Sequence, residues 1–176
     1  MWKINSDIKK RENANDVFIT PLDLSKTHIE RIANKKSYTW YDPFKNSGSY
    51  YNQFPEDNNK DWGEILQGRD FFEYTPKNRH LCICSNPPYS LMDKVLERSV
   101  ELKPKIISYL IGINNLTTKR MEFMEKNGYF IIDMHLTKVF KWFGMSACIT
   151  WGKKKKGIIS YDRKVWRDED DKKKLK

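Results

Sequence analysis

The sequence predicts an α/β fold with a doubly wound sheet. Short apolar runs that are typical of strands alternate along the chain with segments of helical patterning. Residues 105–111, for example, form a buried-strand pattern, a helix-like segment begins near Thr117, and another strand-like run covers 129–132. Polar residues follow the ends of several of these runs, which is where open α/β sheets bind their ligands. Together these observations favour a doubly wound sheet with a site at the strand ends.

The composition predicts one basic, folded domain. The 176 residues include 39% hydrophobic residues, which is enough for one core and excludes wholesale disorder. Lys and Arg number 33 against 23 Asp and Glu, so the net charge is +10 and nucleic acid is the first candidate partner. No run approaches the length of a membrane span and no signal peptide opens the chain, so we expect a cytoplasmic protein without a membrane partner.

The cysteines and histidines do not form the spacings of a metal or redox site. We expect the three cysteines to be reduced core residues: Cys82, Cys84 and Cys148. The three histidines are scattered and predict no metal centre: His28, His80 and His135.

The chain divides into three parts on composition and patterning. Residues 1–15 read as a polar leader, and 16–152 carry the alternating elements of one catalytic domain. Residues 153–176 form a basic and charged extension with a strand-like piece at 158–161, and we expect its end to be disordered.

The first structured element begins with an apolar run at 16–19, followed by Thr20 and Pro21. Thr20 suits the N-cap of a helix, Pro21 its first position, and Asp23 the reciprocal site of a capping box. A helix is therefore expected to begin here.

A strand-like run at 38–41 leads into a tight turn of small residues at 42–49. Such a strand, turn and helix start is typical of the first crossover of a doubly wound sheet. The polar stretch that follows, 50–60, is too short for a full crossover helix, so shortened crossovers are expected. Glu64 would then end the second strand, where an acidic residue can hold the hydroxyl pair of a ribose.

The apolar run 81–84 ends abruptly in Asn86-Pro87-Pro88-Tyr89. The amide oxygen of Asn86 and a backbone carbonyl can accept both N–H bonds of a planar exocyclic amine, and consecutive prolines remove competing donors. Tyr89 offers a face on which a base can stack.

These four residues resemble the catalytic motif of S-adenosylmethionine-dependent amino-methyltransferases, above all the DNA adenine-N6 enzymes, with small phage- and virus-type members the closest match. The turn at 42–48 resembles the cofactor loop of that family, matching at Asp42, Pro43, Phe44 and Gly48. It departs at Asn46, where glycine is usual, although Asn tolerates positive φ better than most residues. The resemblance covers roughly 16–152 and implies a Rossmann-like, mostly parallel seven-stranded sheet with the last strand antiparallel.

The resemblance also implies roles for individual residues. Asn86, Pro87, Pro88 and Tyr89 would form the catalytic loop. The cofactor site would be shaped by Phe18, Thr20, Asp42, Phe44, Gly48, Glu64, Asp70 and Phe71. Among these, Thr20 would help to hold the methionine carboxylate, and Asp70 with Phe71 would frame the cofactor's adenine.

The predicted function is methyl transfer from S-adenosylmethionine to an exocyclic amine, with adenine N6 in DNA favoured and a phage or virus as the expected source, acting in host cytoplasm. Three alternatives stay open. An RNA adenine or guanine amino-methyltransferase could use the same loop. A protein-glutamine methyltransferase carries it too, but usually with a glycine-richer cofactor loop and an N-terminal helical domain. A non-catalytic nucleic-acid-binding subunit would have no need of an intact Asn-Pro-Pro-Tyr loop.

A lysine-rich stretch supplies the candidate nucleic-acid contacts. Between 138 and 156 there are six lysines and no acid, interleaved with aromatic residues that can stack on bases. The predicted contacts are Lys138, Lys141, Trp142, Lys153, Lys154, Lys155 and Lys156. We expect a partner subunit or a second copy of the chain to supply target selectivity.

Overall fold

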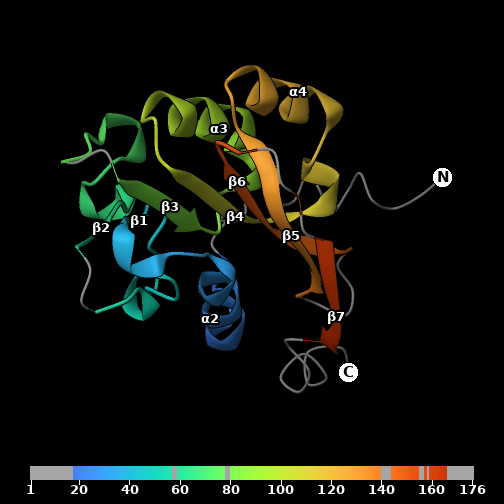
Figure 1. The fold of residues 1–176 in the computed structure, drawn as a ribbon. Coiled ribbons are helices and arrows are strands. Elements are labelled where there is room, and N and C mark those ends of the chain that lie inside the picture. The colour runs from blue at the N-terminus through green and yellow to red at the C-terminus, as the bar shows by residue number, and fades with distance from the viewer. Residues whose placement is uncertain are drawn as a thin grey trace.

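A seven-stranded sheet with helices on both faces forms the centre of the computed structural model (Figure 1). The structure describes residues 18–56, 59–77, 80–139, 144–154 and 157, and the backbone of 159–165. The strands are β1 (Thr39–Asp42), β2 (Lys60–Trp62), β3 (Leu81–Ser85), β4 (Ile106–Gly112), β5 (Phe130–Lys138), β6 (Ser146–Gly152) and β7 (Ile159–Val165). Their order across the sheet is β2-β1-β3-β4-β6-β5-β7.

The strand directions match the predicted sheet in part. β1 pairs in parallel with β2 and with β3, and β3 pairs in parallel with β4. β6 runs antiparallel between β4 and β5, whereas β7 is parallel to β5. The expectation that the last strand is antiparallel therefore fits β6 but not β7, and the sheet continues past residue 152.

Among the described residues, three α-helices cover the two faces of the sheet. α2 (Leu22–Arg31) lies on one face, and α3 (Met92–Glu101) and α4 (Thr118–Lys126) lie on the other (Figure 1). Alternate residues of β3 belong to two separate cores, Leu81 and Ile83 on the α3 side and the two β3 cysteines on the α2 side. Burial on both faces explains the continuous apolar run of this strand. None of the helices in the described part of the chain is long and apolar enough to cross a membrane.

The crossovers after β1 and β2 are short, as expected. In their described residues, the connection after β1 contains the 3₁₀ turn Tyr51–Gln53, and that after β2 contains the turns Ile65–Gln67 and Phe71–Glu73. β2 ends at Trp62, so the prediction that Glu64 lies at the end of a strand is wrong. The backbone of Glu64 pairs with Arg69 instead, which closes a tight turn.

α2 begins one residue later than the sequence predicts. Pro21 occupies the N-cap position and no side chain caps the helix, so the predicted capping box of Thr20 and Asp23 is wrong. The Thr20 hydroxyl accepts a hydrogen bond from Asn86 Nδ2 at 3.2 Å, which competes with capping.

A buried polar chain fixes α2 on the sheet. The His28 ring nitrogens lie 2.9 Å from the Tyr50 hydroxyl and 2.8 Å from Ser108 Oγ, and Ser108 continues to Thr150. Burial, with a smaller contribution from Arg31, lowers the pKa of His28 to about 3, so the ring is neutral. A bidentate pair from Arg31 to Asp133 on β5 fixes the other end of the helix.

Asp42, the last residue of β1, is buried at the carboxyl end of the strand. Its Oδ1 accepts from Ser85 Oγ at 2.6 Å and from the Phe44 amide at 3.3 Å, and its Oδ2 accepts from the Tyr51 amide at 3.2 Å. One carboxylate thus joins the ends of β1 and β3 to both ends of the first crossover loop. Burial raises the pKa of Asp42 to about 7 although these hydrogen bonds favour the charged form.

This pKa predicts a pH dependence of stability. Between about pH 4 and about pH 7 the folded chain holds a proton at Asp42 that the unfolded chain has released, so raising the pH through this window destabilises the fold. Chemical denaturation of the parent and of Asp42→Asn across this range should show that the parent loses stability relative to the variant as pH rises. Two curves that stay parallel would contradict the assignment.

Candidate functional site

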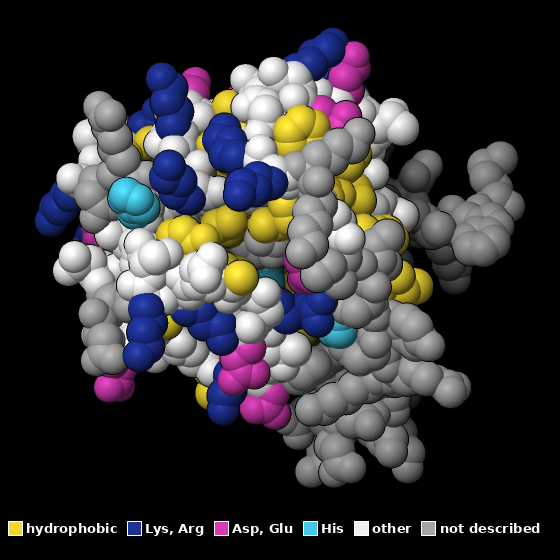
Figure 2. Space-filling model, in the orientation of Figure 1, with side chains coloured by type: hydrophobic (Ala, Val, Ile, Leu, Met, Phe, Trp, Pro, Cys, Tyr) yellow, Lys and Arg dark blue, Asp and Glu magenta, His cyan; other side chains and the backbone are white. Residues whose placement is uncertain are grey.

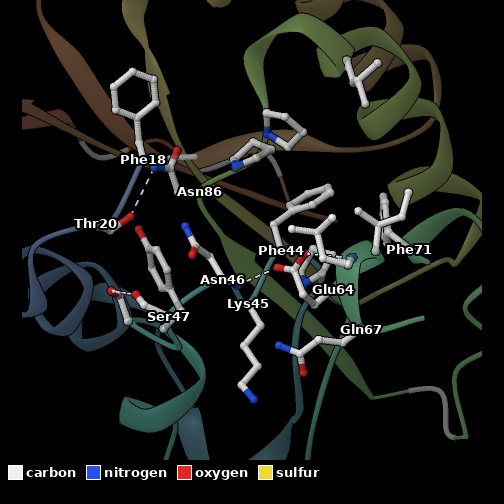
Figure 3. Close-up of a pocket in the computed structure, with 18 of the residues that line it drawn as sticks. Phe18, Thr20, Phe44, Lys45, Asn46, Ser47, Glu64, Gln67, Phe71 and Asn86 are labelled. Atoms are coloured by element: carbon white, nitrogen blue, oxygen red, sulfur yellow. Dashed lines mark hydrogen bonds between the residues drawn. The ribbon is translucent and has the colours of Figure 1, made fainter. Parts of the chain in front are cut away.

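A cavity of about 420 Å³ lies beyond the carboxyl ends of β1 and β3 (Figure 3). Four chain segments line it, namely the approach to α2, the loop after β1, the turns after β2 and the loop after β3. The lining residues are Phe18, Thr20, Pro43, Phe44, Lys45, Asn46, Ser47, Ser49, Tyr50, Glu64, Ile65, Leu66, Gln67, Asp70, Phe71, Phe72, Asn86, Pro87, Pro88, Tyr89 and Leu91. The cavity thus occupies the position at which open α/β sheets bind ligands.

Most of the candidate site residues named from the sequence come together here. The predicted catalytic loop, 86–89, lines the cavity. So do six predicted cofactor residues: Phe18, Thr20, Phe44, Glu64, Asp70 and Phe71. Asp42 and Gly48 do not line it, because Asp42 lies below the loop and Gly48 is buried within it.

The loop after β1 turns sharply at two residues. Asn46 has φ 45° and Gly48 has φ 87°, and both values lie in the left-handed region. The expectation that Asn46 accommodates the turn is therefore confirmed. The φ of Gly48 favours glycine there, and a Cβ would lie 2.7 Å from Asn52 Nδ2, so that the Asn52 side chain would have to move.

Glu64 holds the walls of the cavity together. Its Oε2 accepts from the Asn46 amide at 2.9 Å, and its Oε1 accepts from the Leu66 amide at 3.3 Å. Asp70 caps the following turn in the same way by accepting from the Phe72 amide. Both carboxylates therefore support the backbone while they line the cavity.

The amide of Asn86 is oriented by Thr20. Asn86 Nδ2 donates to Thr20 Oγ1, and Pro87 and Pro88 bring no backbone N–H to the loop. With its NH₂ group bonded to Thr20, the amide has its carbonyl oxygen left as an acceptor. Figure 3 shows Asn86, Thr20 and Phe18 on one side of the cavity and Glu64, Phe44 and Phe71 on the other.

Aromatic and aliphatic side chains form the remaining surface. Phe44 and Phe71 meet edge to face, with ring centroids 5.3 Å apart. At the rim, Ile65 and Leu66 keep 69% and 85% of their surface exposed. The cavity therefore offers apolar faces to a planar ring together with a few fixed polar groups, as small-molecule sites do.

Several lining residues were not predicted from the sequence. Tyr50 lines the cavity, and its hydroxyl lies 2.9 Å from Nδ1 of His28, which is 22 residues earlier in the chain on α2. Lys45 lines the cavity while its amine lies 4.1 Å from the centroid of the Trp62 ring. A position next to Phe44 was the available signal for Lys45, and no local pattern marks Tyr50.

The predicted nucleic-acid lysines are divided between two edges of the sheet. Lys138 ends β5 close to the end of β4 that faces the cavity edge, whereas Lys153 and Lys154 follow β6 at the opposite edge. The Lys153 amine lies 3.3 Å from the Tyr129 ring centroid. Lys141, Trp142, Lys155 and Lys156 lie outside the described residues. Nucleic-acid binding by all of these residues stays a prediction.

The cysteines and histidines do not add a metal site. All three cysteines are free and buried, as expected, and burial raises the pKa of the Cys82 and Cys84 thiols. Within the described parts of the chain, no cluster of His, Cys, Asp or Glu could hold a metal ion.

Comparison with known proteins shows a shared fold. No protein-family model and no curated protein matches the sequence. A proposed RNA methyltransferase from Pyrococcus horikoshii superposes with a TM-score of 0.55 and 11% identity, over 75% of this chain and 79% of that one. A proposed hemolysin from Lactococcus lactis gives 0.56 and 11%, over 82% and 91% of the two chains.

The modification subunit of a proposed type I restriction enzyme from Vibrio vulnificus also gives a TM-score of 0.56 and 11% identity, over 88% of this chain and 49% of that one. At this level of identity the likeness concerns the fold alone. The chain therefore shares the α/β fold of these proteins, and the chemistry of its cavity has to be argued from its own residues.

Proposed function

We propose that this protein transfers a methyl group from S-adenosylmethionine to an exocyclic amine, with adenine N6 in DNA as the favoured substrate. The observation that carries the proposal is the convergence of separate segments on one cavity. The Asn-Pro-Pro-Tyr loop, a pair of aromatic rings and two carboxylates come from separate segments of the chain and line the same space.

The cavity suits the cofactor in size and in chemistry. Its volume of about 420 Å³ falls within the range of small-molecule sites. S-Adenosylmethionine, when bound, supplies an electrophilic methyl group on a positively charged sulfur. Glu64 and Asp70 would accept hydrogen bonds from its ribose and amino groups, and Phe44 and Phe71 would contact its adenine.

The chain's own contribution to the reaction would be orientation and charge placement. Asn86 Oδ1 and the Pro87 carbonyl would accept hydrogen bonds from the two N–H groups of the target amine and direct its lone pair toward the methyl donor. Tyr89 would stack on the target base. Thr20 would keep Asn86 in the orientation that presents oxygen to the amine.

Nucleic acid is the proposed substrate class because the chain carries a net charge of +10. A duplex target would have to be flipped out of its stack to reach the cavity. DNA is favoured by the motif, and the likeness to a proposed RNA methyltransferase makes RNA the second candidate. The likeness to a modification subunit supports a proposed partner subunit.

Incubation with radiolabelled S-adenosylmethionine and separate pools of DNA, RNA and protein tests the function directly. Nucleoside analysis of the labelled DNA should recover N6-methyladenine. Label in RNA would select the second candidate, and label in protein glutamine would select the third. Absence of label from every pool, with nucleic acid still bound, would instead support a non-catalytic subunit.

Replacing Asn86 by alanine tests the catalytic loop. We expect transfer to fall by about 100-fold or more, because a positioned polar group at the reacting atoms is lost. Calorimetric affinity for S-adenosylmethionine should stay close to the parent value, since Asn86 faces the amine. Near-parent turnover in Asn86→Ala would refute the assignment.

Thr20 variants separate its two proposed roles. If Thr20 orients Asn86, Thr20→Val should lower the transfer rate about tenfold, the effect of one hydrogen bond, while cofactor affinity is retained. Thr20→Ser keeps the acceptor and should restore most of the rate. A fall in cofactor affinity at unchanged turnover would instead assign Thr20 to the methionine carboxylate.

Glu64 and Asp70 can be compared as cofactor ligands. Glu64→Ala should weaken S-adenosylmethionine binding by about 1–3 kcal/mol, because it removes a ligand and also releases the Asn46 and Leu66 amides. Glu64→Gln keeps one acceptor for these amides and should lose less. If calorimetry finds the affinity of both variants unchanged, Asp70→Asn is the next variant to measure.

A further inference from the structure

Lysines gather at the edge of the sheet that lies opposite the cavity. Parallel strands β1, β3 and β4 begin at this edge and antiparallel β6 ends there, with Ile106 paired to Gly152. Figure 2 shows Lys and Arg side chains gathered over the region where β3 and β4 begin. We call this surface the lysine edge and define it by Lys36, Lys77, Lys103, Lys105, Lys153 and Lys154.

The sheet itself brings these lysines side by side. The Lys105 amide donates to the Leu81 carbonyl, which places the start of β4 beside the start of β3. The Thr39 amide donates to the carbonyl of His80, which places the start of β1 on the other side of β3. The starts of β1, β3 and β4 therefore lie next to one another along this edge.

The lysine edge has little compensating negative charge. The loops that carry it, at 33–38, 74–80, 102–105 and 152–157, contain no Asp or Glu. None of its lysines forms an ion pair with an acid among the described residues, where the ion pairs lie elsewhere. The pKa of Lys153 is lowered by burial and by the neighbouring charge of Lys105. The lysine edge does not extend from β1 to β2, because the loop before β2 carries Glu56.

Like charges on neighbouring loops repel one another, and a bound polyanion would relieve that repulsion. Lysines act as point charges with flexible stems, which suits a row of phosphates more than one planar carboxylate. A membrane surface fits less well, because membrane-binding faces combine basic with exposed apolar groups. None of the large apolar side chains that are exposed in the described residues lies in the loops of the lysine edge; they are Phe18, Ile19, Leu22, Ile65, Leu66, Phe72, Leu91 and Met145.

We propose that the lysine edge binds the phosphate backbone of a nucleic acid, without reading its sequence, at a place separate from the cavity. The cavity follows the ends of β1 and β3, whereas the lysine edge precedes β3 and β4, which have five and seven residues. At about 3.3 Å per residue the two places are roughly 15 to 25 Å apart. The segment held at the lysine edge is therefore a different one from the segment that presents a target amine. This proposal extends the proposed function without depending on methyl transfer.

A charge-matched pair of variants tests the proposal on the full chain. Lys36, Lys77 and Lys105 are changed together to Glu in one protein, and the exposed lysines Lys26, Lys94 and Lys119 are changed to Glu in the other. Both variants have the same net charge. Lys103 is left unchanged because its φ of 51° restricts what can replace it. Near-ultraviolet circular dichroism checks that both proteins are folded.

Fluorescence anisotropy with labelled mixed-sequence DNA and RNA, over a series of salt concentrations, measures binding. The lysine-edge variant should lose roughly ten- to a hundredfold in affinity, and its salt dependence should flatten by about one unit of slope per lysine removed. The control variant should stay much closer to the parent. Asn86→Ala should bind as the parent does, which separates this result from failure of the proposed catalysis.

Equal losses in the two charge variants would overturn the proposal, since net charge alone would then account for binding. Two other results would also overturn it. One is full competition by polyglutamate at the charge concentration of the nucleic acid. The other is equally tight binding of phosphatidylserine vesicles that is lost in the lysine-edge variant.

Discussion

The carboxylate of Asp42 is the constraint on which the cavity depends. It accepts hydrogen bonds from Ser85, immediately before Asn86, and from the amides of Phe44 and Tyr51 at the two ends of the first crossover loop. The Asn-Pro-Pro-Tyr loop and the opposite wall are therefore fixed to one buried group. Glu64 adds a second connection because its carboxylate accepts a hydrogen bond from the backbone amide of Asn46. The walls of the cavity are therefore held in place by carboxylate oxygens that accept hydrogen bonds from backbone amides.

Local patterns predicted the parts of the structure that are decided locally. Asn46 takes the positive φ that its place in the turn demands. α4 begins directly after Thr117, which caps it, where the sequence predicts the start of a helix. Thr20 failed as a cap because a residue 66 positions away in the chain, Asn86, binds its hydroxyl. The contact of the Lys153 amine with the Tyr129 ring could not be predicted either, because it joins residues that become neighbours only when β5 and β6 pair.

The fold restricts where chemistry can occur more than which chemistry occurs. A proposed RNA methyltransferase and a proposed hemolysin share this architecture with the chain at equal identity. What separates such proteins is the set of side chains presented at the strand ends. In this chain that set includes the Asn-Pro-Pro-Tyr loop and Thr20. The Thr20 hydroxyl accepts from the amide nitrogen of Asn86, which leaves the amide oxygen of Asn86 as an acceptor.

The short connection after β1 has a consequence for which ligands the cavity excludes. Doubly wound proteins that bind dinucleotides place a pyrophosphate at the N-terminus of their first crossover helix. In the described part of this connection only a 3₁₀ turn forms, at Tyr51–Gln53, so that electropositive helix end is missing. A pyrophosphate would also meet the carboxylates of Glu64 and Asp70 in the lining, where Lys45 is the one basic residue among the described residues and its amine lies over the Trp62 ring. The cavity should therefore discriminate against NAD-like molecules and admit a nucleoside whose charged group is a cation.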